Sequence, residues 1–178
     1  MSAPRSSTFW LTGLSGAGKS TLARSLDLRL KALGHLCYVL DGDEMREGLC
    51  SDLGFSPEAR AENIRRLAEV AKLMNRAGVH VIVAAISPSA RSRALAHEIV
   101  GVDNFFEVYV ETPLKTCIDR DPKGYYARAI AGELKQFTGI SAAYEAPLAP
   151  AFRLDTAAQP LDVSAGVLTD FVIGQIEK

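Results

Sequence analysis

The amino-acid sequence predicts an α/β fold in which a parallel sheet of about five strands carries helices on both faces. Two observations lead to this prediction. Short apolar runs of strand length alternate along the chain with longer segments in which apolar residues recur every three or four positions. The chain also has 178 residues, of which 48% are hydrophobic and 23% charged, as expected for one globular domain over 1–178. Strands that alternate with helices form right-handed βαβ units, so the sheet should be parallel.

The first part of the chain predicts a strand, a helix and a second strand. Residues 7–12 are an apolar run that ends at a glycine, which is typical of a buried strand. Residues 19–33 carry leucines at helical spacing, and Gly34 ends that helix. Residues 35–40 are the second apolar run of strand length.

Two helices and a strand are expected next. Residues 45–49 predict a short helix, and residues 57–77 a long one, because Ser56 can cap it, a proline follows in its first turn and Gly78 closes it. Residues 79–86 are a β-branched run too short for a helix, which indicates a strand.

The rest of the chain repeats the alternation. Its apolar periodicity predicts helices over 89–100, 113–120 and 163–176, with strands over 105–110 and 151–156. Between the last two strands, residues 121–150 are rich in Gly, Pro, Ala and Tyr and keep no sustained period. A stretch this long is more than a plain connection, so it predicts an active-site lid.

A phosphate-binding loop lies between the first predicted strand and the first predicted helix. The residues fit G-x-x-x-x-G-K-[ST] followed by a threonine, and they are Gly13, Leu14, Ser15, Gly16, Ala17, Gly18, Lys19, Ser20 and Thr21. The glycines allow backbone N–H groups to surround a phosphate, and the helix N-terminus adds positive potential. Lys19 can reach the β- and γ-phosphates, and the Ser20 hydroxyl can ligate Mg²⁺. The sequence therefore predicts a P-loop nucleotide-binding protein.

The absence of other nucleotide motifs narrows the class. No [NT]-K-x-D stretch specifies guanine, and the D-x-x-G at 121–124 follows a helix rather than the third strand. The small size favours a small-molecule kinase over a switch protein or a mechanical ATPase.

Two aspartates follow the second predicted strand. Ligands of open α/β sheets bind beyond the carboxyl ends of the strands, so Asp41 and Asp43 should face the γ-phosphate. One of them could accept a hydroxyl proton or hold the metal. The alternative is an Asx turn without chemistry.

The long helix adds a second indication of a polar substrate. Arg60 and Asn63 extend the apolar stripe formed by Ile64 and Leu67, and polar groups on an inward face are costly without a polar partner. With Arg46 nearby in sequence, they indicate an anionic substrate, although a frayed helix end in water is the alternative.

Two loop phenylalanines have two interpretations. Phe55 precedes the long helix, and Phe137 lies in the predicted lid. They are either core residues or flat faces that sandwich a base.

Composition excludes several other classes. The formal charge of −1 gives no general attraction to nucleic acid or anionic lipid. No apolar run is long enough to span a membrane, and no signal peptide is visible, so we expect a cytoplasmic protein. Cys37, Cys50 and Cys117 form no CxxC pair and are expected to be buried free thiols. The histidines have no metal or triad spacing.

Seven segments in order resemble the adenylyl-sulfate kinase family and together span most of the chain. They are 13–21 (GLSGAGKST), 40–46 (LDGDEMR), 53–66 (LGFSPEARAENIRR), 86–88 (ISP), 106–114 (FEVYVETPL), 117–124 (CIDRDPKG) and 137–147 (FTGISAAYEAP). The resemblance implies transfer of the γ-phosphate of ATP to the 3′-hydroxyl of adenosine 5′-phosphosulfate, giving 3′-phosphoadenosine 5′-phosphosulfate, with Mg²⁺ as cofactor.

The resemblance also implies roles for single residues. Asp41 or Asp43 would orient or deprotonate the hydroxyl, and Ser20 and Asp41 would hold the metal. Lys123 would reach the phosphates from the lid. The remaining acceptor contacts would come from Arg46, Phe55, Arg60, Asn63, Ile86, Ser87, Phe137 and Thr138. Ser87 matches a serine described as a phosphoserine intermediate in some members, but in-line transfer favours backbone contacts over covalency.

Three departures from the family pattern concern the lid and its surroundings. Ser89 replaces an aromatic, Ala127 stands where lysines are common, and residues 141–143 replace an acidic-x-Pro stretch. These departures bear on lid closure and rate. The family also implies a homodimer, with the sulfurylase step on a separate chain. The alternatives are a P-loop kinase for another small hydroxyl substrate and a non-catalytic nucleotide-binding module.

Overall fold

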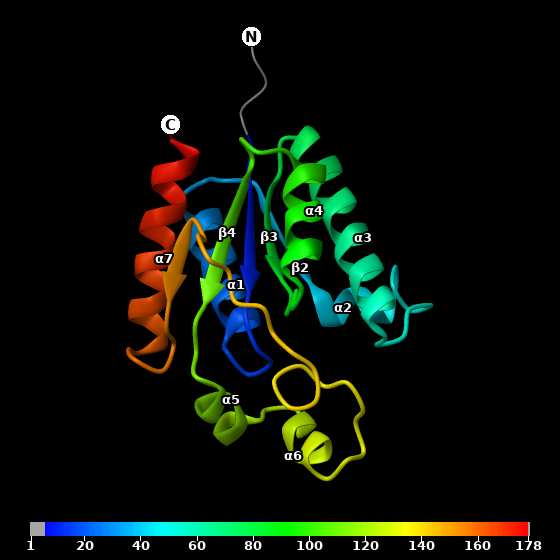
Figure 1. Cartoon of the computed structure of the whole chain (residues 1–178). Helices are drawn as coiled ribbons and strands as arrows, with labels where there is room; N and C mark the ends of the chain where they lie inside the picture. The colour runs from blue at the N-terminus through cyan, green and yellow to red at the C-terminus, as the bar shows by residue number, and fades with distance from the viewer. Residues whose placement is uncertain (1–5, 178) are drawn as a thin grey trace.

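The computed structural model describes residues 6–177 and forms one five-stranded parallel sheet (Figure 1). The strand order is β2-β3-β1-β4-β5, and every pairing is parallel. The strands are β1 (Thr8–Thr12), β2 (Cys37–Asp41), β3 (His80–Ala84), β4 (Phe105–Val110) and β5 (Phe152–Leu154). Each strand overlaps the segment for which a strand was predicted, so the predicted sheet is confirmed.

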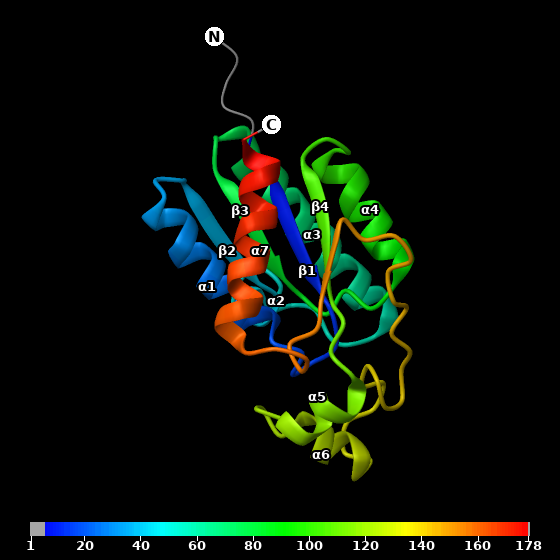
Figure 2. The same cartoon turned by 90° about the vertical axis from the view of Figure 1, so that its left-hand side faces the viewer.

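Helices cover both faces of the sheet, as Figures 1 and 2 show. One face carries α1 (Lys19–Ala32) and α7 (Leu161–Ile176), and the other carries α3 (Pro57–Arg76) and α4 (Ala90–Val100). The shorter helix α2 (Gly42–Glu47) directly follows β2, so it begins earlier than its sequence pattern indicated. The α/β class with two helical layers is confirmed.

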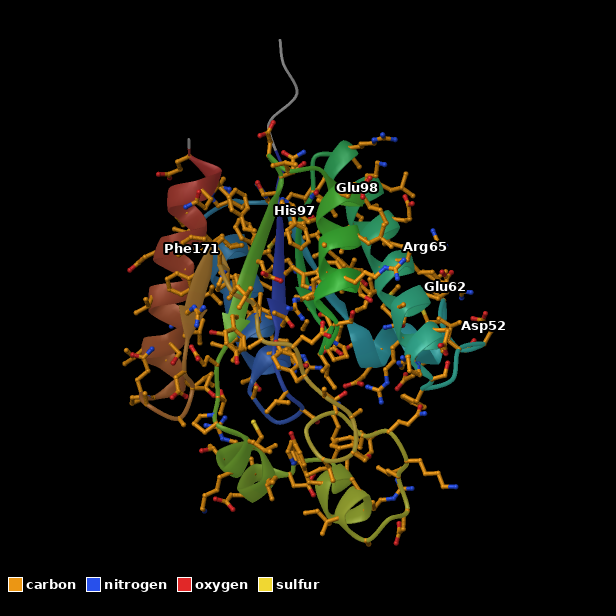
Figure 3. All side chains as sticks on the ribbon, viewed as in Figure 1. Asp52, Glu62, Arg65, His97, Glu98 and Phe171 are labelled. Carbon is orange, nitrogen blue, oxygen red and sulfur yellow. The ribbon has the colours of Figure 1, made fainter. Side chains whose placement is uncertain are left out.

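The central strand β1 supplies side chains to two separate cores. Phe9 and Leu11 pack in the cluster that contains Leu26 of α1, whereas Trp10 packs in the cluster that contains Leu67 of α3. Successive side chains of a strand point to opposite faces, so a continuous apolar run indicates burial on both sides. On α7, Phe171 faces the sheet and stacks on Phe152 at 4.6 Å between ring centroids (Figure 3).

The long helix α3 begins and packs as its sequence predicted. The Ser56 side chain accepts a hydrogen bond from the Ala59 backbone N–H at 3.2 Å. Leu67 is fully buried, while Glu62 and Arg65 pair at 2.7 Å on the outer side of the helix (Figure 3). The N-terminal turn of α3 lies beside residues 121–150, because Arg60 hydrogen-bonds to Thr138 and Gln136.

One helix in the lid was not predicted. After α5 (Leu114–Arg120), residues 121–150 contain α6 (Tyr125–Ile130), although the sequence indicated no regular structure there. The Asp121 carboxylate accepts hydrogen bonds from the backbone N–H groups of Tyr126 and Ala127, at 3.1 and 3.0 Å. A helix of fewer than two turns is too short to produce a periodic signal, which explains the error.

The described residues confirm two expectations drawn from composition. Across 6–177, no helix combines the length and hydrophobicity that crossing a membrane requires. Cys37, Cys50 and Cys117 are all buried free thiols.

Candidate active site

The phosphate loop connects β1 to α1 at the carboxyl edge of the sheet. A Cβ atom on Gly13 would lie 2.6 Å from the Val110 carbonyl oxygen of β4, so only glycine fits beside that strand. Gly18 has a φ of 100° and precedes α1 without a side-chain cap. The first N–H groups of α1 therefore have no capping side chain, which suits them to bind phosphate oxygens.

Lys19 is buried at the start of α1 and folds back over this loop. Its Nζ donates hydrogen bonds to the carbonyl oxygens of Gly13 and Leu14, at 2.9 and 2.7 Å. Burial lowers the pKa of Lys19 to about 8, and the nearby Asp43 carboxylate opposes part of this shift. When a nucleotide is present, the Lys19 ammonium group can exchange these two carbonyl partners for phosphate oxygens.

Three residues that the sequence analysis did not single out hydrogen-bond to backbone carbonyls of the phosphate loop. The hydroxyls of Thr112 and Thr156 both donate to the Ala17 carbonyl, at 3.1 and 2.7 Å. Arg120 of α5 donates to the carbonyl oxygens of Gly16 and Thr156, at 3.3 and 2.8 Å. Thr112 and Thr156 follow the ends of β4 and β5, which was the available signal for them.

The two aspartates after β2 occupy different environments. Asp41 is 5% exposed, and its Oδ1 accepts a hydrogen bond from the Asp43 backbone N–H at 2.9 Å, which caps α2. Asp43 is exposed and forms an ion pair with Lys123 of the lid. Asp41 therefore forms the Asx-type cap that was the alternative prediction, and it also lies at the end of β2 as the catalytic prediction required. One residue can fill both roles.

The guanidinium groups of Arg46 and Arg60 both lie close to the exposed Phe55 ring. The Arg46 guanidinium carbon is 4.5 Å from the ring centroid, and that of Arg60 is 5.9 Å from it. Partial burial lowers the pKa of each guanidinium, which nevertheless stays charged at neutral pH. Two cations and one aromatic face are therefore gathered in one place.

Arg60 also connects this region to the lid. Its Nη1 donates to the Thr138 hydroxyl at 2.8 Å, and its Nη2 donates to the Gln136 carbonyl at 2.7 Å. One turn further along α3, Asn63 is buried, and its Oδ1 has no hydrogen-bond partner within 6–177. The frayed-end alternative for Arg60 and Asn63 is wrong, because Arg60 is bonded to the lid and Asn63 is buried.

The two phenylalanines differ in their surroundings. Phe55 is 62% exposed, whereas Phe137 is 9% exposed and belongs to the core cluster beneath the lid. The Phe137 ring meets the rings of Tyr126 and Tyr125 edge to face, at 5.1 and 6.2 Å between centroids. Phe55 thus has the exposure that stacking on a ligand requires, and Phe137 has the packing of a core residue in this conformation.

Ser87 lies in the turn between β3 and α4, in a backbone conformation unusual for serine. Its φ is 44°, and its side chain is only 1% exposed. The hydroxyl donates to the Ala85 carbonyl at 3.0 Å and accepts from Trp10 Nε1 at 2.9 Å. The adjacent Ile86 carbonyl accepts from the Thr12 hydroxyl at 2.7 Å. This turn is therefore fixed by hydrogen bonds to β1.

The lid contacts both halves of the site. On the phosphate-loop side, the Tyr126 hydroxyl donates to the Ser15 carbonyl at 2.9 Å. On the other side, Lys123 pairs with Asp43, and Thr138 accepts from Arg60. The phosphate loop, Asp43 and Arg60 therefore all contact the same lid.

The site combines a buried lysine over a glycine loop, two nearby aspartates and a lid that contacts both the loop and Asp43. P-loop kinases hold a transferable phosphate with such an arrangement. The fold and the site together define this chain as a P-loop phosphotransferase for a small molecule.

Comparison with known proteins identifies the family. The model of the family described as adenylylsulphate kinase matches residues 5–155, so the chain belongs to the adenylyl-sulfate kinase family of ATP-dependent phosphotransferases. The chain is 53% identical over 169 residues to an adenylyl-sulfate kinase of Shewanella amazonensis, covering 95% of this chain and 85% of that relative. The family resemblance drawn from the motifs is confirmed.

Solved structures agree with this assignment. The APS kinase CysC of Mycobacterium tuberculosis, solved in complex with AMPPNP and APS, matches with a TM-score of 0.91 and 48% identity, covering 95% of this chain and 98% of that one. A hexameric APS kinase from Thiobacillus denitrificans matches with a TM-score of 0.72 and 30% identity, covering 97% of this chain and 30% of that one.

Proposed function

We propose that this chain transfers the γ-phosphate of ATP to the 3′-hydroxyl of adenosine 5′-phosphosulfate, giving 3′-phosphoadenosine 5′-phosphosulfate. The observation that supports this acceptor most directly is the grouping of Arg46 and Arg60 around the Phe55 ring. A substrate with an anionic end and a flat base uses both kinds of contact. The unpartnered Asn63 Oδ1 adds a buried acceptor that a ribose hydroxyl or an adenine amino group could satisfy.

On the donor side, residues 13–21 bind the phosphates of ATP. Lys19 exchanges its carbonyl partners for β- and γ-phosphate oxygens and stabilises the charge on the transferred group. Ser20 at the start of α1 and Asp41 at the end of β2 offer the hard oxygen donors that Mg²⁺ prefers, and few protein ligands are needed because phosphates and water supply the rest. Bound there, Mg²⁺ neutralises phosphate charge.

Within this site Asp41 orients the hydroxyl of the acceptor substrate or takes its proton. Its burial and its cap to the Asp43 N–H hold the carboxylate in one position, which suits a general base. Asp43 keeps Lys123 at the mouth of the site, and Lys123 moves with the lid to the phosphates. Ile86 and Thr138 complete the acceptor site, and Phe137 adds a second aromatic face once lid movement releases it from its packing against Tyr126.

Ser87 acts through its position rather than as a phosphoenzyme. Its hydroxyl donates a hydrogen bond to the Ala85 carbonyl in a buried turn, so phosphorylation would remove that bond and place a charged group where the side chain is only 1% exposed. Direct in-line transfer needs only the two substrates held together.

We also propose that the protein is a cytoplasmic homodimer that receives its acceptor from a sulfurylase on a separate chain. The description of the Thiobacillus relative as hexameric supports self-association in this family.

A substrate panel with ATP and Mg²⁺ tests the proposal. We expect adenosine 5′-phosphosulfate to give a 3′-phosphorylated product, whereas nucleosides and sugar acids give little. Phosphorylation of another hydroxyl compound instead would make the chain a kinase of different specificity. ATP binding without any turnover would indicate a nucleotide-binding module.

A further inference from the structure

Arg93 is a buried charged residue that none of the roles above uses. It lies in the first turn of α4 and is 4% exposed. Its Nε donates to Glu107 Oε1 of β4 at 2.8 Å, so the buried charge is paired. An ion pair alone would need only one edge of the guanidinium group.

The other two nitrogens of Arg93 reach two segments that are far apart in sequence. Nη1 donates to the Ser87 carbonyl at 2.7 Å, and Nη2 donates to the Glu145 carbonyl at 2.6 Å. Ser87 belongs to the acceptor-side turn, and Glu145 lies where the lid returns to the sheet. The fixed fork of one guanidinium group therefore sets the distance between the turn and the lid.

Glu145 reinforces the same junction through its own groups. Its backbone N–H donates to the Pro88 carbonyl at 2.9 Å, and its carboxylate accepts from the Ala90 N–H at 2.6 Å, at the N-terminus of α4. The neighbouring Tyr144 hydroxyl lies 2.9 Å from the Thr12 hydroxyl at the end of β1. The end of the lid is thus fastened to the turn, and Arg93 is the group that bonds to both.

The Ser87 backbone explains why such a fastening matters. A serine with a φ of 44° is in the left-handed region, which costs free energy and persists only where surrounding contacts compensate for that cost. The Arg93 bond holds the Ser87 carbonyl, while Trp10 and Ala85 hold its side chain. Without Arg93, the carbonyl of this turn loses its charged partner, and the backbone can relax to an ordinary conformation.

We infer that Arg93 is a positioning residue of the acceptor site, which holds the turn at Ser87 and the end of the lid at Glu145 in register. This inference rests on the proposed function only for the identity of the acceptor. It assigns Arg93 no contact with either substrate, and it leaves the phosphate loop independent of Arg93.

The variant Arg93→Lys tests the inference, because it keeps a positive charge near Glu107 but cannot donate along three diverging directions. We expect the KM for adenosine 5′-phosphosulfate to rise about tenfold, as for the loss of well-formed hydrogen bonds, while the KM for ATP changes little. Arg91→Lys is the matched control, since Arg91 is exposed on the same helix, and it should behave as the wild type.

Glu107→Gln separates positioning from stability. It removes the ion pair but leaves the two carbonyl bonds of Arg93, so it should lower the melting temperature without raising the acceptor KM. Two results would overturn the inference in favour of a purely structural role. One is a rise in the acceptor KM for Glu107→Gln as large as that for Arg93→Lys. The other is a rise in the KM for ATP as large as that for the acceptor in Arg93→Lys.

Hydrogen–deuterium exchange gives a readout that needs no substrate. In Arg93→Lys, the amides of Ala90 and Glu145 should exchange faster than in the wild type and in Arg91→Lys. Unchanged exchange at both amides would overturn the inference even if the enzyme were active. A wild type that turns over a different acceptor would overturn the proposed function, while faster exchange would still support the junction.

Discussion

Replacing Phe55 with alanine removes the aromatic face from the acceptor site and changes little else. The ring is 62% exposed, so its loss leaves no cavity in the core. Its contact with Arg46, at 4.5 Å from the ring centroid, is a cation–π interaction of about 0.5–1 kcal/mol at an exposed site. In a protein of this size, that loss lowers the melting temperature by about 1–4 °C.

The effect on the acceptor should be much larger. Stacking of a base on an aromatic side chain contributes about 1–3 kcal/mol, which corresponds to about a 5- to 150-fold change in Kd. We therefore expect Phe55→Ala to weaken binding of adenosine 5′-phosphosulfate within that range, while the Kd for ATP stays the same. Calorimetric titration of each ligand and a melting curve on the same sample measure all three quantities.

Two further variants sharpen the test. Phe55→Tyr keeps an aromatic face and should bind the acceptor nearly as the wild type does. Leu73→Ala removes an equally exposed apolar side chain, also 62% exposed, from the outer part of α3 and should change neither affinity. If Phe55→Ala left the acceptor affinity unchanged, or weakened ATP to the same degree, the stacking role would be refuted.

Three other changes have definite expected outcomes. Burial lowers the pKa of Lys19 to about 8, so the free enzyme loses this positive charge as the pH rises. We therefore expect kcat/KM for ATP to fall about tenfold per pH unit above 8, and a flat profile to higher pH would contradict this. Asp41→Asn retains an oxygen that can cap α2, so it should fold normally while kcat falls by about 10²–10⁴, and near-normal turnover would move the role to Asp43. Phe137→Ala opens a cavity beside Tyr126 and should lower the free energy of unfolding by about 3–5 kcal/mol, and with it the melting temperature by about 10 °C, unlike Phe55→Ala. An unchanged melting curve would show that this ring is not structural.

The sheet and the phosphate loop were predictable because their signals are local. The central strands β1 and β3 are buried at every position and consist mostly of apolar residues, as parallel strands covered on both faces do, and the loop is a fixed pattern at a strand–helix junction. The positions of Asp41 and Asp43 followed from the rule that parallel strands present their carboxyl ends to the ligand.

The parts that were not predictable depend on contacts between distant segments. Arg120 braces the loop through Thr156, and Arg60 bonds to Thr138, at separations in sequence that no local pattern reveals. For the same reason the sequence could not show that Phe137 packs against Tyr126 while Phe55 stays exposed. The two phenylalanines look alike in the sequence, and only the packing of the folded chain makes one exposed and the other buried.

The direction in which the parallel strands run has a practical consequence for handling the protein. The start of β1 at Thr8 and the end of α7 at Ile176 lie at one end of the molecule, and the lid lies at the opposite end (Figure 1). A fused domain or a tether to a solid support, attached next to either of these positions, would therefore project away from the lid and the phosphate loop. Tethering at either position should orient every molecule with its lid towards the solution.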